Sequence, residues 1–173
     1  MYHDFNSCYL QQDVALRLAN VQKSIHAIDS NYSLLIFDGV RPLSVQKIMW
    51  DSCKYEARQK KNFLSHPTKT SPHNYGAAVD LSLTYKGTEV DMGTAFDFAG
   101  EAAYTYIESD LVLYGKITKE QLEHRLLLRN AMEQQGFIVN KYEWWHFGAC
   151  YRSQVDSIYP LVVSFDSISA VKL

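Results

Sequence analysis

The sequence is poor in cysteine, proline and glycine, and each shortage argues against a class of structure. Only three cysteines occur, Cys8, Cys53 and Cys150, and no two of them form a Cys-x-x-Cys pair. This spacing argues against a cysteine zinc site and favours free, buried thiols, with a single disulfide left open. Four prolines and eight glycines are spread without repeats, low-complexity tracts or a linker. One domain over residues 1–173 is therefore predicted.

Long apolar runs and blocks of one charge are also absent. No stretch approaches the roughly 20 apolar residues that cross a bilayer, so no membrane span is expected. A formal net charge of −2 without a basic block argues against a nucleic-acid partner. The opening "MYHDFNSCYL" lacks the basic and apolar segments of a secretory signal. A cytoplasmic location is therefore expected, or a periplasmic one if a signal peptide has been removed.

Apolar residues make up 47% of the chain, and their periodicity predicts the first elements. From Gln11 to Ser30 they recur at spacings of three and four, which is typical of one buried helical face. The positions on this face are Val14, Leu18, Val21, Ile25 and Ile28. The run Ser33–Asp38 is predicted to be a short buried strand, and a second helix is expected from about Ser44 to Lys60. The polar segment Asn62–Pro72 is expected to be a loop.

The middle of the chain contains a clear strand pattern. Residues Val79–Tyr85 alternate strictly between apolar and polar side chains, so Asp80 is placed on the polar face of a strand. Gly87 then predicts a turn. This strand would position Asp80, a candidate metal ligand.

The last third of the chain is predicted to contain a helix followed by a strand. Thr118 and Gln121 have the spacing of a capping box, which would start a helix that runs to Gln135 and stops at Gly136. Phe137–Phe147 is predicted to be a strand and its end. Helices interspersed with hairpin-like strands favour an α+β fold, with a mainly antiparallel sheet flanked by helices.

Two histidines and an aspartate could supply metal ligands. His73 precedes the strand that carries Asp80, and a turn over residues 74–76 could bring these two side chains together. His146 lies in the segment "YEWWHF". A catalytic zinc site uses three protein ligands and leaves one position for water, so these three residues would suffice. The alternative for any one of these motifs is a core histidine among packing tryptophans.

Two further charged residues could take part in chemistry at such a site. Glu143 could accept a proton from zinc-bound water, whose pKa falls to roughly 7. Residues i and i+3 of a straight strand point to opposite faces, so Glu143 and His146 can share a site only if the strand bends or ends between them. Arg41 follows a strand and could stabilise an oxyanion. The alternatives are a surface glutamate and a surface arginine paired with Asp38.

Four segments together resemble the zinc D,D-peptidases. "SPHNYGAAVD" fits their S-x-H-x-x-G-x-A-x-D pattern, and "EWWH" fits their E-x-x-H pattern. "FDGVRPLSVQ" and "VDMGTAFDF" are similar to segments of the D-alanyl-D-alanine dipeptidases, the group that includes the vancomycin-resistance dipeptidase. The resemblance spans about Tyr9 to Cys150. It implies a hedgehog/D,D-peptidase-like fold, one zinc ion per chain and hydrolysis of D-Ala-D-Ala to two D-alanines.

The resemblance also implies a role for each matching residue. Zinc would be bound by His73, Asp80 and His146, with Glu143 as general base and Arg41 as oxyanion stabiliser. Asp97 would pair with the free ammonium of a small dipeptide substrate, and Ser71 would help to hold that amino end. A carboxylate is the natural counter-charge for an ammonium group.

The chain departs from the family pattern in three places. Val40 replaces the tyrosine that usually precedes Arg-Pro, and Pro72 stiffens the approach to His73. An additional N-terminal strand of the family is expected to be missing, which would open the pocket. Peptide length and stereochemical preference are therefore not predicted by the residues themselves.

Two other functions remain open at this stage. One is a D,D- or L,D-carboxypeptidase that acts on peptidoglycan stem peptides, which an open pocket would favour. The other is a non-catalytic, zinc-holding cell-wall binding module. Glu143 argues against it, because binding needs no base.

Of Trp144 and Trp145, one is expected to lie in the core and the other in the pocket wall. The remaining histidines, expected to be structural or on the surface, are His3, His26, His66 and His124.

Overall fold

A five-stranded antiparallel sheet forms the centre of the protein. The computed structural model describes residues 7–52, 65–66 and 68–168. The strands are β1 (Tyr32–Asp38), β2 (Ala78–Tyr85), β3 (Thr88–Glu89), β4 (Ile138–Asn140) and β5 (Glu143–Gly148). Their order is β1-β2-β5-β4, and β3 forms a hairpin with β2. Every pairing is antiparallel, which confirms the predicted α+β class with a mainly antiparallel sheet.

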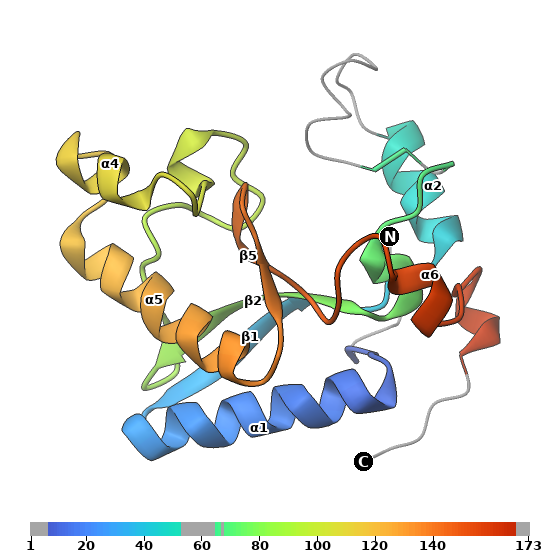
Figure 1. The fold of residues 1–173 in the computed structure, drawn as a ribbon, viewed down its shortest axis with the longest axis horizontal. Coiled ribbons are helices and arrows are strands. Elements are labelled where there is room, and N and C mark those ends of the chain that lie inside the picture. The colour runs from blue at the N-terminus through green and yellow to red at the C-terminus, as the bar shows by residue number, and fades with distance from the viewer. Residues whose placement is uncertain (1–6, 53–64, 67, 169–173) are drawn as a thin grey trace.

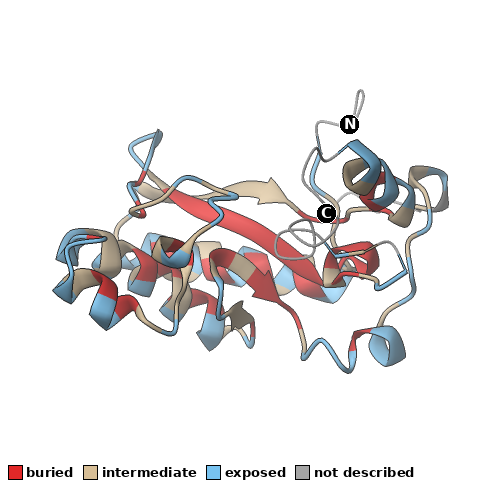
Figure 2. Cartoon of the chain, turned by 90° about the horizontal axis from the view of Figure 1, so that it is seen from above, coloured by how far each residue is buried: buried red, intermediate tan, exposed pale blue. Residues whose placement is uncertain are grey.

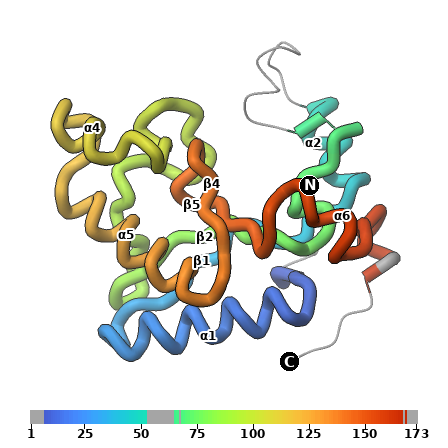
Figure 3. The backbone as a smooth tube through the Cα atoms, viewed as in Figure 1, coloured from blue at the N-terminus to red at the C-terminus, as the bar shows by residue number. Residues whose placement is uncertain are grey.

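Two long helices cover part of this sheet, and shorter elements extend from both of its ends. The helices are α1 (Gln12–Ile28), α2 (Leu43–Ser52), α4 (Glu108–Leu113), α5 (Lys119–Gln134) and α6 (Val155–Ile158). Short 3-10 turns span Pro72–Tyr75, Glu101–Ala103 and Phe165–Ser167. Helices α1 and α5 contact each other, while α1 also contacts β1 and α5 contacts β4 (Figure 1). The tube in Figure 3 shows α2 and α6 together at one end of the molecule and α4 at the other.

Helix α1 buries the predicted face with one exception. Val14, Leu18, Val21 and Ile25 are in the core, whereas Ile28 is 66% exposed, so its predicted burial is wrong. The helix ends at Ile28, because Asp29 takes an extended conformation and its N–H closes the last turn on the Ile25 carbonyl. Ile28 is therefore the last residue of the helix, and its side chain faces solvent.

Strand β2 is the most buried strand, and β1 is less buried than its sequence suggested. Residues 78–83 of β2 are buried on both faces, as the red central strand in Figure 2 shows. All seven residues of β1 are only half-buried, so the prediction of a buried strand is wrong. The reason is its position, since among the described strands β1 lies at the edge of the sheet and pairs with β2 alone.

Helix α5 begins at its predicted cap and ends at Gln134, one residue before the predicted Gln135. The Thr118 hydroxyl accepts from the Gln121 N–H at 3.1 Å, and the Gln121 side chain accepts from the Thr118 N–H at 2.7 Å. The helix stops at Gln134, and Gly136 follows in the left-handed conformation with φ of 76°. The capping box and the glycine stop are both confirmed.

The segment predicted as a single strand after α5 is a hairpin. β4 and β5 are joined by a turn at residues 141–142, in which the Asn140 side chain accepts from the Tyr142 N–H at 2.9 Å. Asparagine favours such turns because its side chain can bond the backbone two residues ahead. Helix α2 is found from Leu43 to Ser52, and the rest of its predicted length to Lys60 lies outside the described residues. Within the described chain, no helix has both the length and the apolar character that a bilayer crossing requires.

Candidate metal centre and its pocket

One polar cavity of about 420 Å³ collects every residue that the sequence predicted for a site. These residues are Arg41, Ser71, His73, Asp80, Asp97, Glu143 and His146. They come from five parts of the chain: the segment after β1, the turn before β2, β2 itself, the loop after β3, and β5. The fold therefore gathers residues up to about a hundred positions apart into one pocket.

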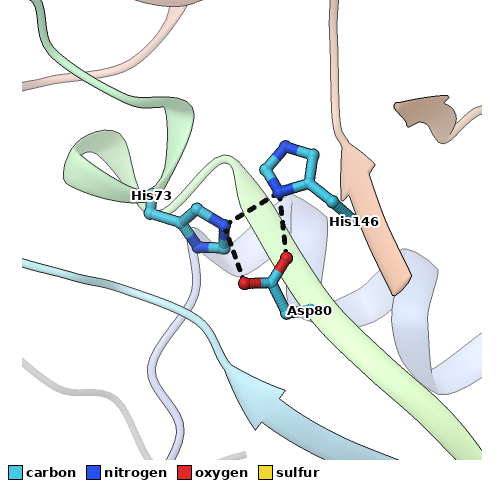
Figure 4. A group of neighbouring side chains, drawn as sticks. All are labelled: His73, Asp80 and His146. Atoms are coloured by element: carbon cyan, nitrogen blue, oxygen red, sulfur yellow. Dashed lines mark hydrogen bonds and ion pairs between the residues drawn. The ribbon is translucent and has the colours of Figure 1, made fainter. Parts of the chain in front are cut away.

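Three potential metal ligands meet inside this cavity. The His73 Nε2 and His146 Nδ1 atoms are 3.1 Å apart. His146 Nδ1 lies 2.9 Å from one carboxylate oxygen of Asp80, and His73 Nε2 lies 3.3 Å from the other. Figure 4 shows the three side chains pointing toward one common point. His73 and Asp80 are almost completely buried, while His146 keeps some exposure toward the pocket.

Local structure explains how His73 reaches Asp80. The Pro72–Tyr75 turn is capped by Ser71 and ends at Gly76, whose φ of 64° lies in the left-handed region that favours glycine. A side chain at position 76 would also come within 2.8 Å of Val40 Cγ2. The chain can therefore reverse directly into β2, as the sequence analysis expected. Asp80 is then paired across the sheet with His146, so their side chains share a face.

The tautomer of His73 is set by the backbone. Its Nδ1 lies 2.8 Å from the Gly39 carbonyl oxygen, which can only accept a hydrogen bond. Nδ1 therefore carries the proton, and the Nε2 lone pair points toward Asp80. Histidine ligands of metals are commonly oriented in this way. Burial opposes the ionisation of Asp80, but the positive charge of the His73 and His146 rings, when these are protonated, holds the pKa of its carboxyl well below the usual range.

The donor set and its spacing fit zinc. Two imidazole nitrogens and one carboxylate oxygen all lie within 4.8 Å of one another. Ligand atoms 2.0–2.1 Å from a tetrahedral ion are roughly 3.3 Å from each other. The nitrogens are 3.1 Å apart, and His146 and His73 lie 2.9 and 3.3 Å from the two different oxygens of the Asp80 carboxylate, which is close to that value. Three protein ligands also leave a fourth position for water or substrate, as catalytic zinc sites do.

A β-bulge solves the problem that Glu143 and His146 should point to opposite faces. One step along β4, from Val139 to Asn140, is matched by four steps along β5, from Phe147 to Glu143. Such a bulge bends the strand and re-aims its side chains. Glu143 and His146 consequently line the same cavity.

Glu143 has a partner that the sequence analysis missed. The Asn140 side-chain N–H donates to Glu143 Oε2 at 2.8 Å, across the irregular end of the hairpin. Burial raises the pKa of Glu143, although the neighbouring His146 opposes this. Asn140 and Glu143 flank the two-residue turn at residues 141–142, so the turn preference of asparagine could have identified this pair.

The two tryptophans divide as the sequence predicted. Trp145 lines the cavity and packs its ring edgewise against Phe96, with ring centroids 5.7 Å apart. Trp144 is buried outside the lining, and its indole N–H donates to the Thr94 hydroxyl at 2.7 Å. Trp145 is therefore the pocket wall and Trp144 belongs to the core.

Arg41 is paired with Asp38 and also lines the cavity. Its guanidinium donates to Asp38 Oδ2 at 2.8 and 2.5 Å, as the paired alternative predicted. Its side chain is only 13% exposed, so the surface location is wrong. Nη2 is also 3.8 Å from Asp80 Oδ2, which places a positive charge at the edge of the ligand cluster.

Asp97 and Ser71 lie on the cavity wall in different settings. Asp97 is an exposed residue in the loop after β3. Its φ is 59°, and a positive φ is uncommon for a residue other than glycine. Partial desolvation and the negative charge of Asp80 raise the pKa of Asp97. Ser71 is buried, and its hydroxyl accepts from the His73 N–H at 3.4 Å, so this side chain also caps the turn.

Asn74 is a second residue that sequence reasoning missed. It is fully buried, donates to the Arg41 carbonyl at 2.6 Å and accepts from the Ser71 N–H at 2.6 Å. It therefore joins the Arg41 segment to the His73 turn. The three-residue spacing from Ser71 to Asn74, which resembles a capping box, could have identified it.

The other histidines and the cysteines lie outside the ligand cluster. His26 is exposed, His66 packs against Trp50, and His124 Nδ1 lies 2.9 Å from the Asp91 carbonyl. Cys8 is exposed and Cys150 is half-buried, and both are free thiols, so only the expected free state is confirmed and the expected burial is wrong. His3 and Cys53 lie outside the described residues.

Comparison with known proteins places the chain in a family. Residues 1–164 match the peptidase M15 model, described as D-ala-D-ala dipeptidase. A D-alanyl-D-alanine dipeptidase of Escherichia coli (strain K12) is 32% identical over 142 residues, which cover 81% of this chain and 66% of that protein. The chain thus spans just under two thirds of this relative. A D-alanyl-D-alanine dipeptidase of Enterococcus faecalis is 27% identical over 165 residues, covering 87% of this chain and 78% of that protein.

A solved structure has a similar fold. It is a vancomycin-resistance D,D-pentapeptidase mutant in complex with Zn(II), with a TM-score of 0.51 and 17% identity. The similarity covers 89% of this chain and 80% of that chain, and it confirms the expected fold. The match to the family model over nearly the whole chain shows that the chain belongs to the D-ala-D-ala dipeptidase family.

Proposed function

We propose that this chain hydrolyses D-Ala-D-Ala to two D-alanines, with one zinc ion held by His73, Asp80 and His146. The observation that carries the proposal is the cavity that Glu143 shares with these three converging donors. The names of the relatives support the substrate, and the Zn(II) complex of the structural neighbour supports the metal. Bound zinc supplies a Lewis acid for the scissile carbonyl and lowers the pKa of water to roughly 7.

Glu143 acts as the general base in this proposal. It faces the ligand cluster and is oriented by the hydrogen bond from Asn140, which leaves its second carboxylate oxygen for a water molecule. Glu143 takes the proton of the attacking water and then passes it to the leaving amine. General base catalysis of this kind contributes about 10²- to 10⁴-fold in rate.

Arg41 stabilises the charge that develops on the substrate oxygen. Its guanidinium is held by Asp38 and lies at the cavity wall beside Asp80. A preorganised cation costs no reorientation when the oxyanion forms. Arg41 therefore acts mainly in the transition state.

Asp97 recognises the free amino end of the dipeptide, and Ser71 assists at that end. A carboxylate on the same wall as the ligands is a suitable counter-charge for an ammonium group. Blocking the amino group should therefore weaken the reaction, because the positive charge is lost. This preference separates a dipeptidase from an enzyme that trims long stem peptides.

The proposal is tested by D-alanine release from D-Ala-D-Ala with zinc-loaded wild type, Glu143→Ala and Glu143→Gln. Glu143→Gln is the matched control, because it keeps the side-chain volume and an oxygen that can accept from Asn140. We expect release by the wild type and a loss of about 10²-fold or more in both variants, with zinc content unchanged. Near-normal turnover in either variant removes Glu143 from the role of base.

An inactive but zinc-loaded wild type would contradict the dipeptide as substrate. The same assay with peptidoglycan stem peptides then decides whether the chain is a carboxypeptidase. Zinc binding without hydrolysis of either substrate class would favour a binding module.

A further inference from the structure

A buried arginine outside the cavity holds both ends of the loop that carries Asp97. We call residues 93–101 the Asp97 loop. Arg125, on helix α5, is 2% exposed and donates through Nε to the Met92 carbonyl at 2.7 Å. Its Nη2 donates to the Ala102 carbonyl at 2.9 Å. One rigid guanidinium group therefore bridges the residues that immediately precede and follow the loop.

Arg125 is itself held by a buried ionic cluster. Its Nη1 lies 3.5 Å from Glu108 Oε1, and both carboxylate oxygens of Glu108 accept from Arg129 Nη2 at 2.7 and 2.6 Å. Glu108 belongs to α4, and the two arginines lie one turn apart on α5. A buried cation must be paired to offset its desolvation, so Glu108 stabilises Arg125 in its bridging position.

The same guanidinium also contacts the strand of the proposed base. Arg125 lies over the ring of Trp144, 5.7 Å from its centroid, within the range of a cation–π interaction. The Trp144 indole donates to Thr94 within the Asp97 loop, and Trp144 directly follows Glu143 in the chain. Loop and strand are thus fixed against one another through Arg125 and Trp144.

The loop requires such support because of the backbone conformation of Asp97. Its φ of 59° is unfavourable for a residue with a side chain and persists where the surroundings determine it. Phe96 fixes the middle of the loop by stacking on Phe37, with ring centroids 4.5 Å apart. Arg125 fixes the two ends, which sets the direction in which the Asp97 carboxylate is presented.

We propose that Arg125 is a positioning residue that sets the Asp97 loop for recognition of a free substrate amino terminus. This inference rests on the proposed dipeptidase function. It assigns a specificity role to a residue that does not line the cavity and matches none of the sequence motifs. Loss of the bridge should therefore impair the choice between free and blocked amino termini more than it impairs bond cleavage.

The test compares Arg125→Lys with Arg129→Lys. Lysine at position 125 keeps the charge but cannot hold two carbonyls in a fixed fork, whereas Arg129 pairs with the same Glu108 without touching the loop. Thr94→Val is a second loop variant that leaves the buried charges unchanged. For each protein, kcat and KM are measured on D-Ala-D-Ala and on its Nα-acetyl derivative. Hydrogen–deuterium exchange of residues 93–101 is recorded alongside.

We expect kcat/KM on D-Ala-D-Ala, divided by kcat/KM on the acetylated dipeptide, to fall about tenfold in Arg125→Lys. A loss of this size corresponds to one charge-assisted hydrogen bond. The change should lie mainly in KM for the free dipeptide. Exchange of residues 93–101 should rise in Arg125→Lys, and less in Thr94→Val. Arg129→Lys should keep both the ratio and the exchange of the loop.

Two results would contradict the role of Arg125. An unchanged ratio in Arg125→Lys, or an equal fall in Arg129→Lys, overturns the inference, because stability alone would then explain the effect. If Arg125→Lys does not fold, the same ratio of kcat/KM is measured for Thr94→Val, and an unchanged ratio there overturns the inference. If the wild type releases no D-alanine, the proposed function fails, and exchange alone shows whether Arg125 positions the loop.

Discussion

Two buried groups of ionisable side chains lie near strand β5, and they differ in how their atoms are matched. In the first, His73, Asp80 and His146 turn two imidazole nitrogens and a carboxylate toward one another. In the second, the carboxylate of Glu108 faces the guanidinium groups of Arg125 and Arg129. The first group opens into a polar cavity, whereas the second is enclosed between α4, α5 and the Asp97 loop.

The difference shows why burial of charge does not by itself identify a metal site. In the Glu108 cluster one carboxylate faces two guanidinium groups, so there is no excess of acceptors that a metal ion could relieve. The His73 cluster brings lone pairs together, and a cation relieves this excess of acceptors. We therefore expect the first cluster to respond to metal and the second to respond mainly to unfolding. Four substitutions test that contrast.

The largest effect is expected at Asp80. Asp80→Asn removes the only anionic ligand, so its loss of zinc affinity should exceed the roughly 10- to 100-fold that supporting partners contribute. D-alanine release should fall to background, as it should after zinc is removed from the wild type with a chelator. Zinc content after dialysis measures the first effect, and restoration of activity by added zinc measures the second. A zinc-loaded Asp80→Asn protein would remove Asp80 from the ligand set.

Arg41→Ala should lower turnover without removing the metal. A cation that meets the developing oxyanion is worth about 10²- to 10³-fold in kcat, and KM should change less. Steady-state kinetics on D-Ala-D-Ala separate the two constants. Arg41→Lys is the control for charge and should lie between wild type and Arg41→Ala. A change confined to KM would make Arg41 a ground-state binder instead.

Glu108→Gln should lower the stability of the protein but leave its zinc content unchanged. Two buried cations lose their common anion, so the free energy of unfolding should fall by about 3 kcal/mol. Urea denaturation measures the loss, and zinc content should remain that of the wild type. Loss of zinc from a Glu108→Gln protein of unchanged stability would contradict the separation of the two clusters.

The smallest effect is expected at the helix cap. Thr118→Ala removes the hydroxyl that accepts from Gln121, and loss of such a cap costs about 1 kcal/mol of stability. Thr118→Ser keeps the hydroxyl and should be nearly neutral. D-alanine release well below the melting temperature should be the same in both variants. A large fall in release would mean that the start of α5 influences the pocket directly.

Much of the fold follows from short-range signals that a single sequence contains. The spacing of Val14, Leu18, Val21 and Ile25 predicts α1, and the alternation around Asp80 predicts β2. Such patterns are local, because they arise from the geometry of one helix or one strand. The same reasoning failed for Ile28 and for β1, since burial there depends on which neighbours cover the element.

The sequence by itself supplied the candidate ligands, the candidate base and the order of the motifs, because these are properties of the residues and their spacing. Tertiary structure decided how these residues meet. The bulge in β5 turns Glu143 and His146 to one cavity, and the Gly39 carbonyl selects the tautomer of His73. Arg125 reaches the Asp97 loop from a helix far along the chain. These contacts join segments distant in sequence, so no local pattern contains them.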